Sequence, residues 1–128
     1  MIAGIGTDIV SITRIRGALE RHAGRFARKV LADAEWTVYL GLPDGAPFVA
    51  KRFAAKEAFF KALGEPPCAA NTWHQLTIGN EPSGRPELKF GSELAALLQR
   101  RGITGWHVSL SDEREYALAN IVLEKEST

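Results

Sequence analysis

The first candidates for chemistry in this sequence are three charged side chains at helical spacing, Lys56, Glu57 and Lys61. Lys56 falls where the apolar stripe of its segment calls for a hydrophobic residue, and Lys61 lies one helical turn after Glu57. Burying an unpaired charge costs several kcal/mol, which is comparable with the whole stability of a small domain. A metal ion, a phosphate or an ion pair should therefore compensate these charges. The alternative is a solvated Glu57–Lys61 pair, worth about 0.3–0.5 kcal/mol, with Lys56 extended toward the surface.

The segment that carries these charges predicts a helix from Pro47 to Leu63. Proline suits a first helical position, Ala, Lys, Glu and Leu are good helix formers, and Gly64 marks the end. The spacing i, i+4, i+7, i+11, i+14 predicts one buried face, made of Val49, Phe53, Lys56, Phe60 and Leu63.

A further carboxylate, Asp8, lies near the end of an apolar, β-branched segment that predicts a buried strand from Ile2 to Val10. Gly4 and Gly6 interrupt this strand, and glycine within a strand often marks the close approach of another backbone or a ligand. Asp8 is therefore either a turn or capping residue or a carboxylate that a rigid strand holds toward a site.

Composition indicates an ordinary soluble globular protein. The 128 residues suit one domain spanning 1–128, and 45% hydrophobic and 24% charged residues are typical values. The single cysteine, Cys68, excludes an intrachain disulfide and fits a reducing compartment. The first residues do not resemble a signal peptide, and no apolar run approaches the roughly 20 residues of a membrane span. We expect a cytoplasmic protein without a membrane segment.

Positive charge is concentrated in one segment, although the net charge is only +1. This segment is either a solvated helix face or a docking surface for an acidic partner. The near-neutral total and the lack of an aromatic-basic platform argue against a nucleic-acid partner. Glu20 is the only acid among its basic residues, which are Arg14, Arg16, Arg21, Arg25, Arg28 and Lys29.

The order of expected elements predicts an α+β fold, a single domain with a largely antiparallel sheet packed with helices. A short helix is expected from Thr13 to about His22, and its apolar stripe continues to an end near Leu31, followed by a short helix that Asp33 could cap. After the central helix, strands at 73–79 and 86–90 form a hairpin. A helix capped by Ser92 and a second hairpin, with strands at 106–111 and 116–123, complete the chain.

The common catalytic motifs are absent, including phosphate-binding and dinucleotide-binding glycine loops, HExxH, paired CxxC and GxSxG. The three histidines have no ligand-like spacing, so a structural zinc site is not expected. His107, Ser109 and Ser111 would share one strand face. This polar row is either a solvated sheet face or a row that faces a ligand.

Two segments together resemble the signature motifs of the phosphopantetheinyl transferases. The first runs Gly-Ile-Gly-Thr-Asp-Ile-Val from Gly4 to Val10 and continues to Arg14-Ile15; the second runs from Arg52 to Gly64. Their order and the chain length resemble the small bacterial type of this family. The resemblance continues through the turn that ends Gly84-Arg85-Pro86 and through 107–111, and so covers nearly the whole chain. It implies the fold of that family.

The resemblance also implies an activity. Such enzymes transfer the phosphopantetheine arm of coenzyme A to a serine of an acyl carrier protein, releasing adenosine 3′,5′-bisphosphate, in fatty acid or polyketide biosynthesis. Asp8 and Glu57 match the family's Mg²⁺ ligands, and a hydrated Mg²⁺ needs only one or two protein carboxylates. Lys61 matches a catalytic lysine at the pyrophosphate, and Lys56 a second lysine near the phosphates. The base that accepts the serine proton is either a water at the metal or Glu57.

The remaining site residues are likewise implied by the resemblance. Coenzyme A would be bound by Lys56, Lys61, Gly64, Gly84, Arg85, Pro86, His107 and Ser109. The acidic carrier protein would dock on Arg14, Arg21 and Arg25. Members of the small type are homotrimers with active sites at subunit interfaces.

The chain departs from the family pattern in two places. Gly64-Glu65-Pro66-Pro67 replaces a Gly-Thr-Gly sequence, and no basic residue precedes the central helix near Ala46. These departures bear on how the adenine and the 3′-phosphate are bound. The competing hypothesis is a non-catalytic module that binds an acidic protein, with Asp8 and Glu57 as ordinary structural carboxylates.

Overall fold

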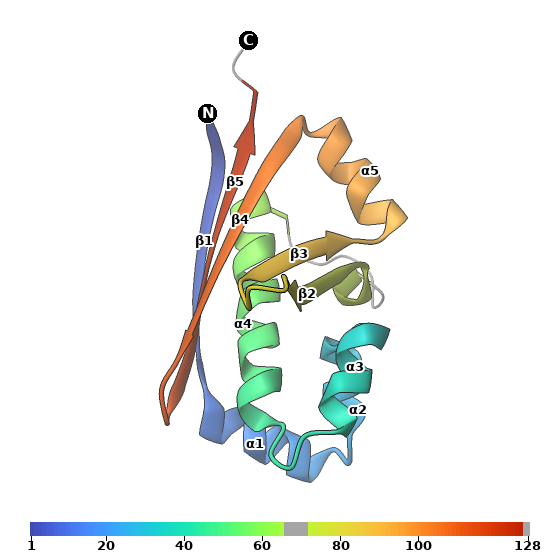
Figure 1. Ribbon diagram of the computed structural model, residues 1–128, viewed down its shortest axis with the longest axis vertical. Helices are drawn as coiled ribbons and strands as arrows, with labels where there is room; N and C mark the ends of the chain where they lie inside the picture. Colours follow the sequence, from blue (N-terminus) through green and yellow to red (C-terminus); the bar gives the residue numbers. More distant parts are fainter. Residues whose placement is uncertain (66–71, 127–128) are drawn as a thin grey trace.

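The structure is a computed structural model that describes residues 1–65 and 72–126. A three-stranded antiparallel sheet forms one layer of the fold (Figure 1). Its central strand is β5 (Tyr116–Lys125), which pairs with β1 (Ile2–Ser11) on one side and with β4 (Ile103–Asp112) on the other. The expected loop residues Pro66, Pro67 and Cys68 lie outside the described part of the chain.

The register of the sheet assigns its polar residues to two opposite faces. Asp8 pairs with the buried Ala119, and Ser109 pairs with the exposed Asn120. Neighbouring residues along a strand point to opposite faces. Asp8 therefore lies on the inner face of the sheet, and Ser109 and His107 lie on the outer face.

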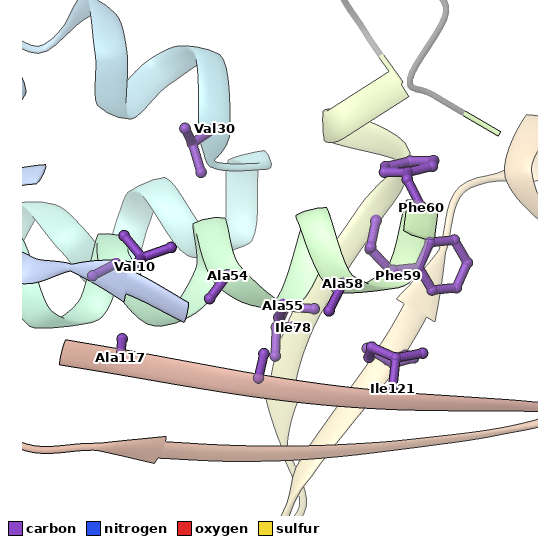
Figure 2. Packing of buried hydrophobic residues seen from close by; sticks show 14 of the residues in the cluster. Val10, Val30, Ala54, Ala55, Ala58, Phe59, Phe60, Ile78, Ala117 and Ile121 are labelled. Carbon is purple, nitrogen blue, oxygen red and sulfur yellow. The ribbon is translucent and has the colours of Figure 1, made fainter. Parts of the chain in front are cut away.

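The helix α4 (Ala46–Leu63) runs along the inner face of the sheet (Figures 1 and 2). Figure 2 shows Ala54, Ala55 and Ala58 on the side of the helix that faces β5. The predicted end is confirmed, because Gly64 caps the helix with a φ of 79°. The prediction of a single buried face is wrong, because β2 and the preceding helices cover the opposite side of α4 as well.

Three short helices precede α4, namely α1 (Ile12–Arg21), α2 (Arg25–Val30) and α3 (Asp33–Leu40). The apolar stripe that continues to Leu31 does not form one helix. Ala23 and Gly24 adopt positive φ values of 46° and 88°, which no α-helix accommodates, and the chain turns there. The predicted helix is therefore two helices.

The second sheet is the predicted hairpin of β2 (Leu76–Asn80) and β3 (Pro86–Phe90). The expected strand start at Trp73 is wrong, since Thr72–Gln75 forms the 3₁₀ turn η1. Helix α5 (Ser92–Arg100) begins one residue earlier than a Ser92 cap would place it, with Gly91 as the capping residue. The side chain of Gln75 accepts the free N–H groups of Glu93 and Leu94 in its first turn.

The α+β prediction is confirmed: two antiparallel sheets and five α-helices enclose one apolar core around α4 in the described part of the chain. Within those same residues, no helix is both long and apolar enough to cross a bilayer.

Candidate active site

Two glycines bring β1 into backbone contact with α4. A Cβ atom on Gly4 would lie 1.9 Å from the carbonyl oxygen of Ala62, and one on Gly6 would lie 1.8 Å from that of Ala58. No side chain fits at either position, so the glycines mark the close backbone approach that their position in a strand predicted. This contact fixes Asp8, two residues after Gly6, against the helix that carries Glu57.

Asp8, Glu57 and Lys61 meet at this contact, as predicted for the catalytic group. The Lys61 ammonium donates to Asp8 Oδ1 at 2.9 Å and to the carbonyl oxygen of Thr7 at 3.1 Å. The Asp8 side chain is only 16% exposed, whereas that of Lys61 is 53% exposed. The Lys61 ammonium is therefore paired with a carboxylate, that of Asp8, that is largely shielded from solvent.

The pKa of the Glu57 carboxyl depends on burial and on the same two charged neighbours. Burial raises the pKa of its carboxyl, the nearby Asp8 carboxylate raises it further, and the Lys61 ammonium opposes both effects. Two carboxylates close enough to disfavour each other's charge are stabilised when a cation lies between them. This electrostatic arrangement suits a divalent cation between the two carboxylates. Lys61 lies beside Asp8, where its ammonium can bind an anionic ligand.

The donor set indicates which metal would fit. In the described residues, no group of three or more His, Cys, Asp and Glu side chains converges on one point. A zinc site would require such a group. Mg²⁺ instead keeps several waters and takes one or two carboxylates plus phosphate oxygens of a substrate. Asp8 and Glu57 are a sufficient set for that ion.

Asp8 and Glu57 line one side of a cleft of about 900 Å³. The opposite wall comes from α1 and α2, with the basic residues Arg14 and Arg21 and the aromatic residue Phe26. The cleft therefore combines an acidic floor, a basic wall and an apolar lining. A smaller hollow of about 280 Å³ lies on the other side of Glu57 and includes Lys61 and Gly64.

The basic residues of the first helices differ in whether they have partners. Arg16 pairs with Asp44 at 2.8 Å, and Arg28 pairs with Asp33 at 3.5 Å and lies over the Trp36 ring. Across residues 1–65 and 72–126, no carboxylate lies within ion-pair distance of the three predicted docking residues. These residues, Arg14, Arg21 and Arg25, are also exposed, so they remain available for an acidic partner.

Lys56 is not at the site. Its side chain is fully buried, and its ammonium donates to Glu35 Oε1 at 2.6 Å, to the Val30 carbonyl oxygen at 2.7 Å and to the Trp73 carbonyl oxygen at 3.0 Å. Every N–H of the ammonium is used, so none is free for a phosphate. The expectation that Lys56 binds coenzyme A near the phosphates is therefore wrong. Of the three kinds of compensation that the sequence left open, Lys56 has the ion pair, with Glu35.

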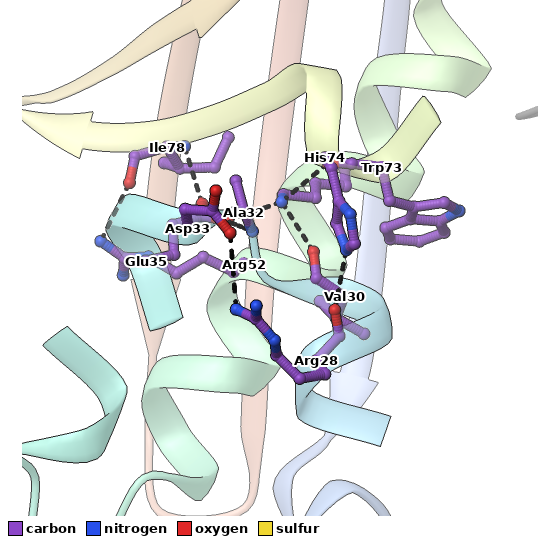
Figure 3. Close-up of polar contacts among 10 residues, drawn as sticks. Arg28, Val30, Ala32, Asp33, Glu35, Arg52, Trp73, His74 and Ile78 are labelled. Carbon is purple, nitrogen blue, oxygen red and sulfur yellow. Dashed lines mark hydrogen bonds and ion pairs between the residues drawn. The ribbon is translucent and has the colours of Figure 1, made fainter. Parts of the chain in front are cut away.

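Glu35 was missed in the sequence. The available signal was the buried position of Lys56 itself, since a lysine on an apolar helix face needs an acid from elsewhere in the chain. Burial lowers the pKa of the Lys56 ammonium, and the Glu35 carboxylate opposes this by favouring the charged form. Figure 3 shows the acid lying between Ala32, Ile78 and the segment of Val30.

The other residues predicted to bind coenzyme A lie apart from the cleft. Gly84, Arg85 and Pro86 are in or beside the β2–β3 turn, where Gly84 has a φ of 92°. His107 and Ser109 are exposed on the outer sheet face, and the His107 ring contacts the Glu124 carboxylate. These positions do not line the cleft of Asp8 and Glu57.

The fold is that of a known class of transferases. The chain belongs to the 4′-phosphopantetheinyl transferase superfamily, whose sequence model matches residues 4–121. A relative from Nitrosomonas europaea, a holo-[acyl-carrier-protein] synthase, is 48% identical over 125 residues, which are 98% of this chain and 100% of that protein.

Solved structures agree with this assignment. The holo-[acyl-carrier-protein] synthase of Neisseria meningitidis superposes with a TM-score of 0.92 at 39% identity, covering 98% of this chain and 100% of that one. The synthase of Bacillus anthracis, solved in complex with coenzyme A (3′,5′-ADP), superposes with a TM-score of 0.81 at 33% identity, covering 98% and 99%.

Proposed function

We propose that this protein transfers the 4′-phosphopantetheine arm of coenzyme A to a serine of an apo acyl carrier protein, and so serves fatty acid or polyketide biosynthesis. The observation that carries the proposal is the pair Asp8 and Glu57, held together by the β1–α4 contact at a cleft with a basic wall. The relatives named holo-[acyl-carrier-protein] synthase over their full length support it. We place the reaction in the cytoplasm, since a single cysteine suits a reducing compartment.

Asp8 and Glu57 would hold a Mg²⁺ ion, completed by water and by oxygens of the coenzyme A pyrophosphate. When bound, this ion would orient the pyrophosphate and neutralise the charge that builds on the leaving phosphate. Burial raises the pKa of Glu57 and the nearby Asp8 carboxylate raises it further, and a cation at this position would favour the charged carboxylate, which supports the assignment.

The chain's own residues would perform the remaining steps. The carrier serine hydroxyl would give its proton to Glu57 or to a water at the metal, and its oxygen would form a bond to the phosphorus of the arm. The bond from that phosphorus to the oxygen of the second phosphate would break, and adenosine 3′,5′-bisphosphate would leave. Lys61, whose ammonium is half exposed beside Asp8, would bind the pyrophosphate oxygens and supply a proton to the leaving phosphate. The nucleophile belongs to the carrier, so no serine of this chain is required.

The carrier protein would dock on the exposed arginines of α1 and α2. For Arg14→Ala we expect the KM for the carrier protein to rise about three- to tenfold, more at low salt than at high salt, with the KM for coenzyme A unchanged. Arg16→Ala on the same helix is the matched control, because the Arg16 guanidinium already forms an ion pair with Asp44. Equal KM values for Arg14→Ala and the wild type would contradict this docking site.

The active form would be a homotrimer assembled through the outer face of the β1–β5–β4 sheet. Ile5 and Ile9 are 64% and 63% exposed on that face, beside Val122 and Leu118. Contact between subunits would cover these residues. It would also bring the strand of His107 to the cleft of a neighbouring subunit, which a shared coenzyme A site requires because His107 lies apart from the cleft within one chain. Light scattering that gives the molar mass of one chain would contradict this assembly.

The decisive experiment is the intact mass of an apo acyl carrier protein after incubation with this protein, coenzyme A and Mg²⁺. We expect a mass gain of one phosphopantetheine group, which disappears with EDTA because the metal neutralises the leaving phosphate. A gain that persists in EDTA would contradict the metal assignment. No gain with several carrier proteins would instead favour a non-catalytic module that binds an acidic protein.

A further inference from the structure

The buried pair Lys56–Glu35 has no part in the proposed chemistry, yet it is the most deeply buried ion pair in the described residues. Both side chains are at most 1% exposed. A buried ion pair is often no more stabilising than well-packed apolar residues of the same volume, so its presence calls for a role other than stability.

The pair joins four segments of the chain to α4. Lys56 bonds the last residue of α2, Val30, and the η1 residue Trp73. Glu35 Oε1 accepts the backbone N–H of Ala32 at 2.8 Å, and Oε2 accepts that of Ile78 in β2 at 2.8 Å (Figure 3). The lysine and the acid therefore connect the ends of α2 and α3 with η1 and β2.

This connection bears directly on the cleft. Lys56 is the residue before Glu57, so any shift of α4 relative to α2 changes the position of Glu57 against the opposite wall. That wall includes Phe26 of α2, whose ring lies 5.9 Å from Phe53 of α4. The ring of Phe53 in turn stacks on that of Trp73, with 5.5 Å between centroids, which connects this side of the cleft to η1.

We propose that Lys56 and Glu35 are positioning residues for the carrier protein: they hold the α2 wall of the cleft at a fixed distance from Glu57. This inference rests on the proposed transferase function. The helix that they anchor, α2, also carries the exposed Arg25, and the rest of the wall includes Arg14 and Arg21 of α1. Loss of the pair should therefore impair the approach of the carrier protein more than the binding of coenzyme A.

The test compares Lys56→Met and the double variant Lys56→Met/Glu35→Gln with the wild type, under conditions where circular dichroism shows each to be folded. We expect the KM for the carrier protein to rise about fivefold or more in both variants, while the KM for coenzyme A changes less than about twofold. The double variant removes both charges of the pair, so neither partner is left as an unpaired buried ion, and Arg52, whose charge Glu35 also favours, keeps its bond to the Ile78 carbonyl oxygen.

Lys51→Met is the matched control, with the same substitution on the same helix. Lys51 pairs with Asp112 at 3.5 Å, at the end of β4 and away from α2. Its two KM values should equal those of the wild type. Unchanged KM values in the folded Lys56 variants would overturn the inference. An equal rise of the KM for the carrier protein and of the KM for coenzyme A would overturn it as well.

Failure of the proposed function and failure of the positioning role give different results. A wild-type chain that transfers nothing contradicts the proposed function, and the inference with it. A wild type that transfers normally beside a Lys56→Met variant with an unchanged carrier KM contradicts only the positioning role. A rise in the coenzyme A KM alone would return Lys56 to the phosphate contact implied by the family resemblance.

Discussion

Glu57→Gln should reduce phosphopantetheine transfer by at least about 10³-fold, which corresponds to about 4 kcal/mol of lost transition-state stabilisation. The substitution keeps the shape of the side chain and removes only the charge that would hold the metal. Asp8 would then be the only carboxylate at the site, and Lys61 already neutralises it at 2.9 Å. The measurement is the initial rate of carrier modification by intact mass at saturating coenzyme A and Mg²⁺.

The same variant should fold at least as stably as the wild type in the absence of metal. A carboxyl whose pKa is raised by folding destabilises the native state while it is ionised, at pH values above that raised pKa. This effect disappears as the pH falls and the carboxyl takes up a proton. Since Glu57 has such a raised pKa, its neutral replacement should not lower the unfolding temperature at neutral pH.

Glu87→Gln is the matched control for both measurements. Glu87 is likewise partly buried, it lies on β3 away from the cleft, and its partner is the exposed Lys89. Rate and unfolding temperature should both stay at wild-type values. A Glu57→Gln variant with Mg²⁺-dependent transfer within tenfold of the wild type would remove Glu57 from the metal site.

Two carboxylates of this site could be located from the sequence because each has a local signal. Glycines within a strand indicate a close backbone approach, and Asp8 follows them on the same strand. Glu57 lies beside the buried stripe of a helix with a clear beginning and end. The resemblance to phosphopantetheinyl transferases then joined the two segments, which local patterns alone could not do.

The role of Lys56 could not be predicted, because it depends on a contact between distant segments. Glu35 lies 21 residues earlier on a helix of eight residues, where Asp33 is an equally plausible acid. Nothing in the local pattern shows which of the two turns inward. The helix break at Ala23 and Gly24 was missed because the apolar stripe continues across it; Gly24 was the available signal, since glycine accepts a positive φ that alanine rarely adopts.

Gly6→Ala should lower the unfolding free energy by about 3 kcal/mol or more, at the upper end of the range for overpacked sites. The new Cβ would lie 1.8 Å from the Ala58 carbonyl oxygen, and backbone atoms cannot rotate away as a side chain does. Strand β1 must separate from α4, and Asp8 moves with it. Thermal denaturation should show a midpoint about 10 °C lower or more, and folded molecules should bind Mg²⁺ more weakly.

Gly79→Ala separates this steric effect from the general effect of removing a strand glycine. Gly79 lies in β2, and a Cβ there would be no closer than 3.8 Å to its nearest neighbour, the flexible side chain of Glu87. Alanine should be tolerated or slightly stabilising at this position, because it reduces the freedom of the unfolded chain. If Gly6→Ala unfolds at the same temperature as Gly79→Ala, the β1–α4 contact does not hold the two carboxylates together. The metal site would then need another explanation than this backbone contact.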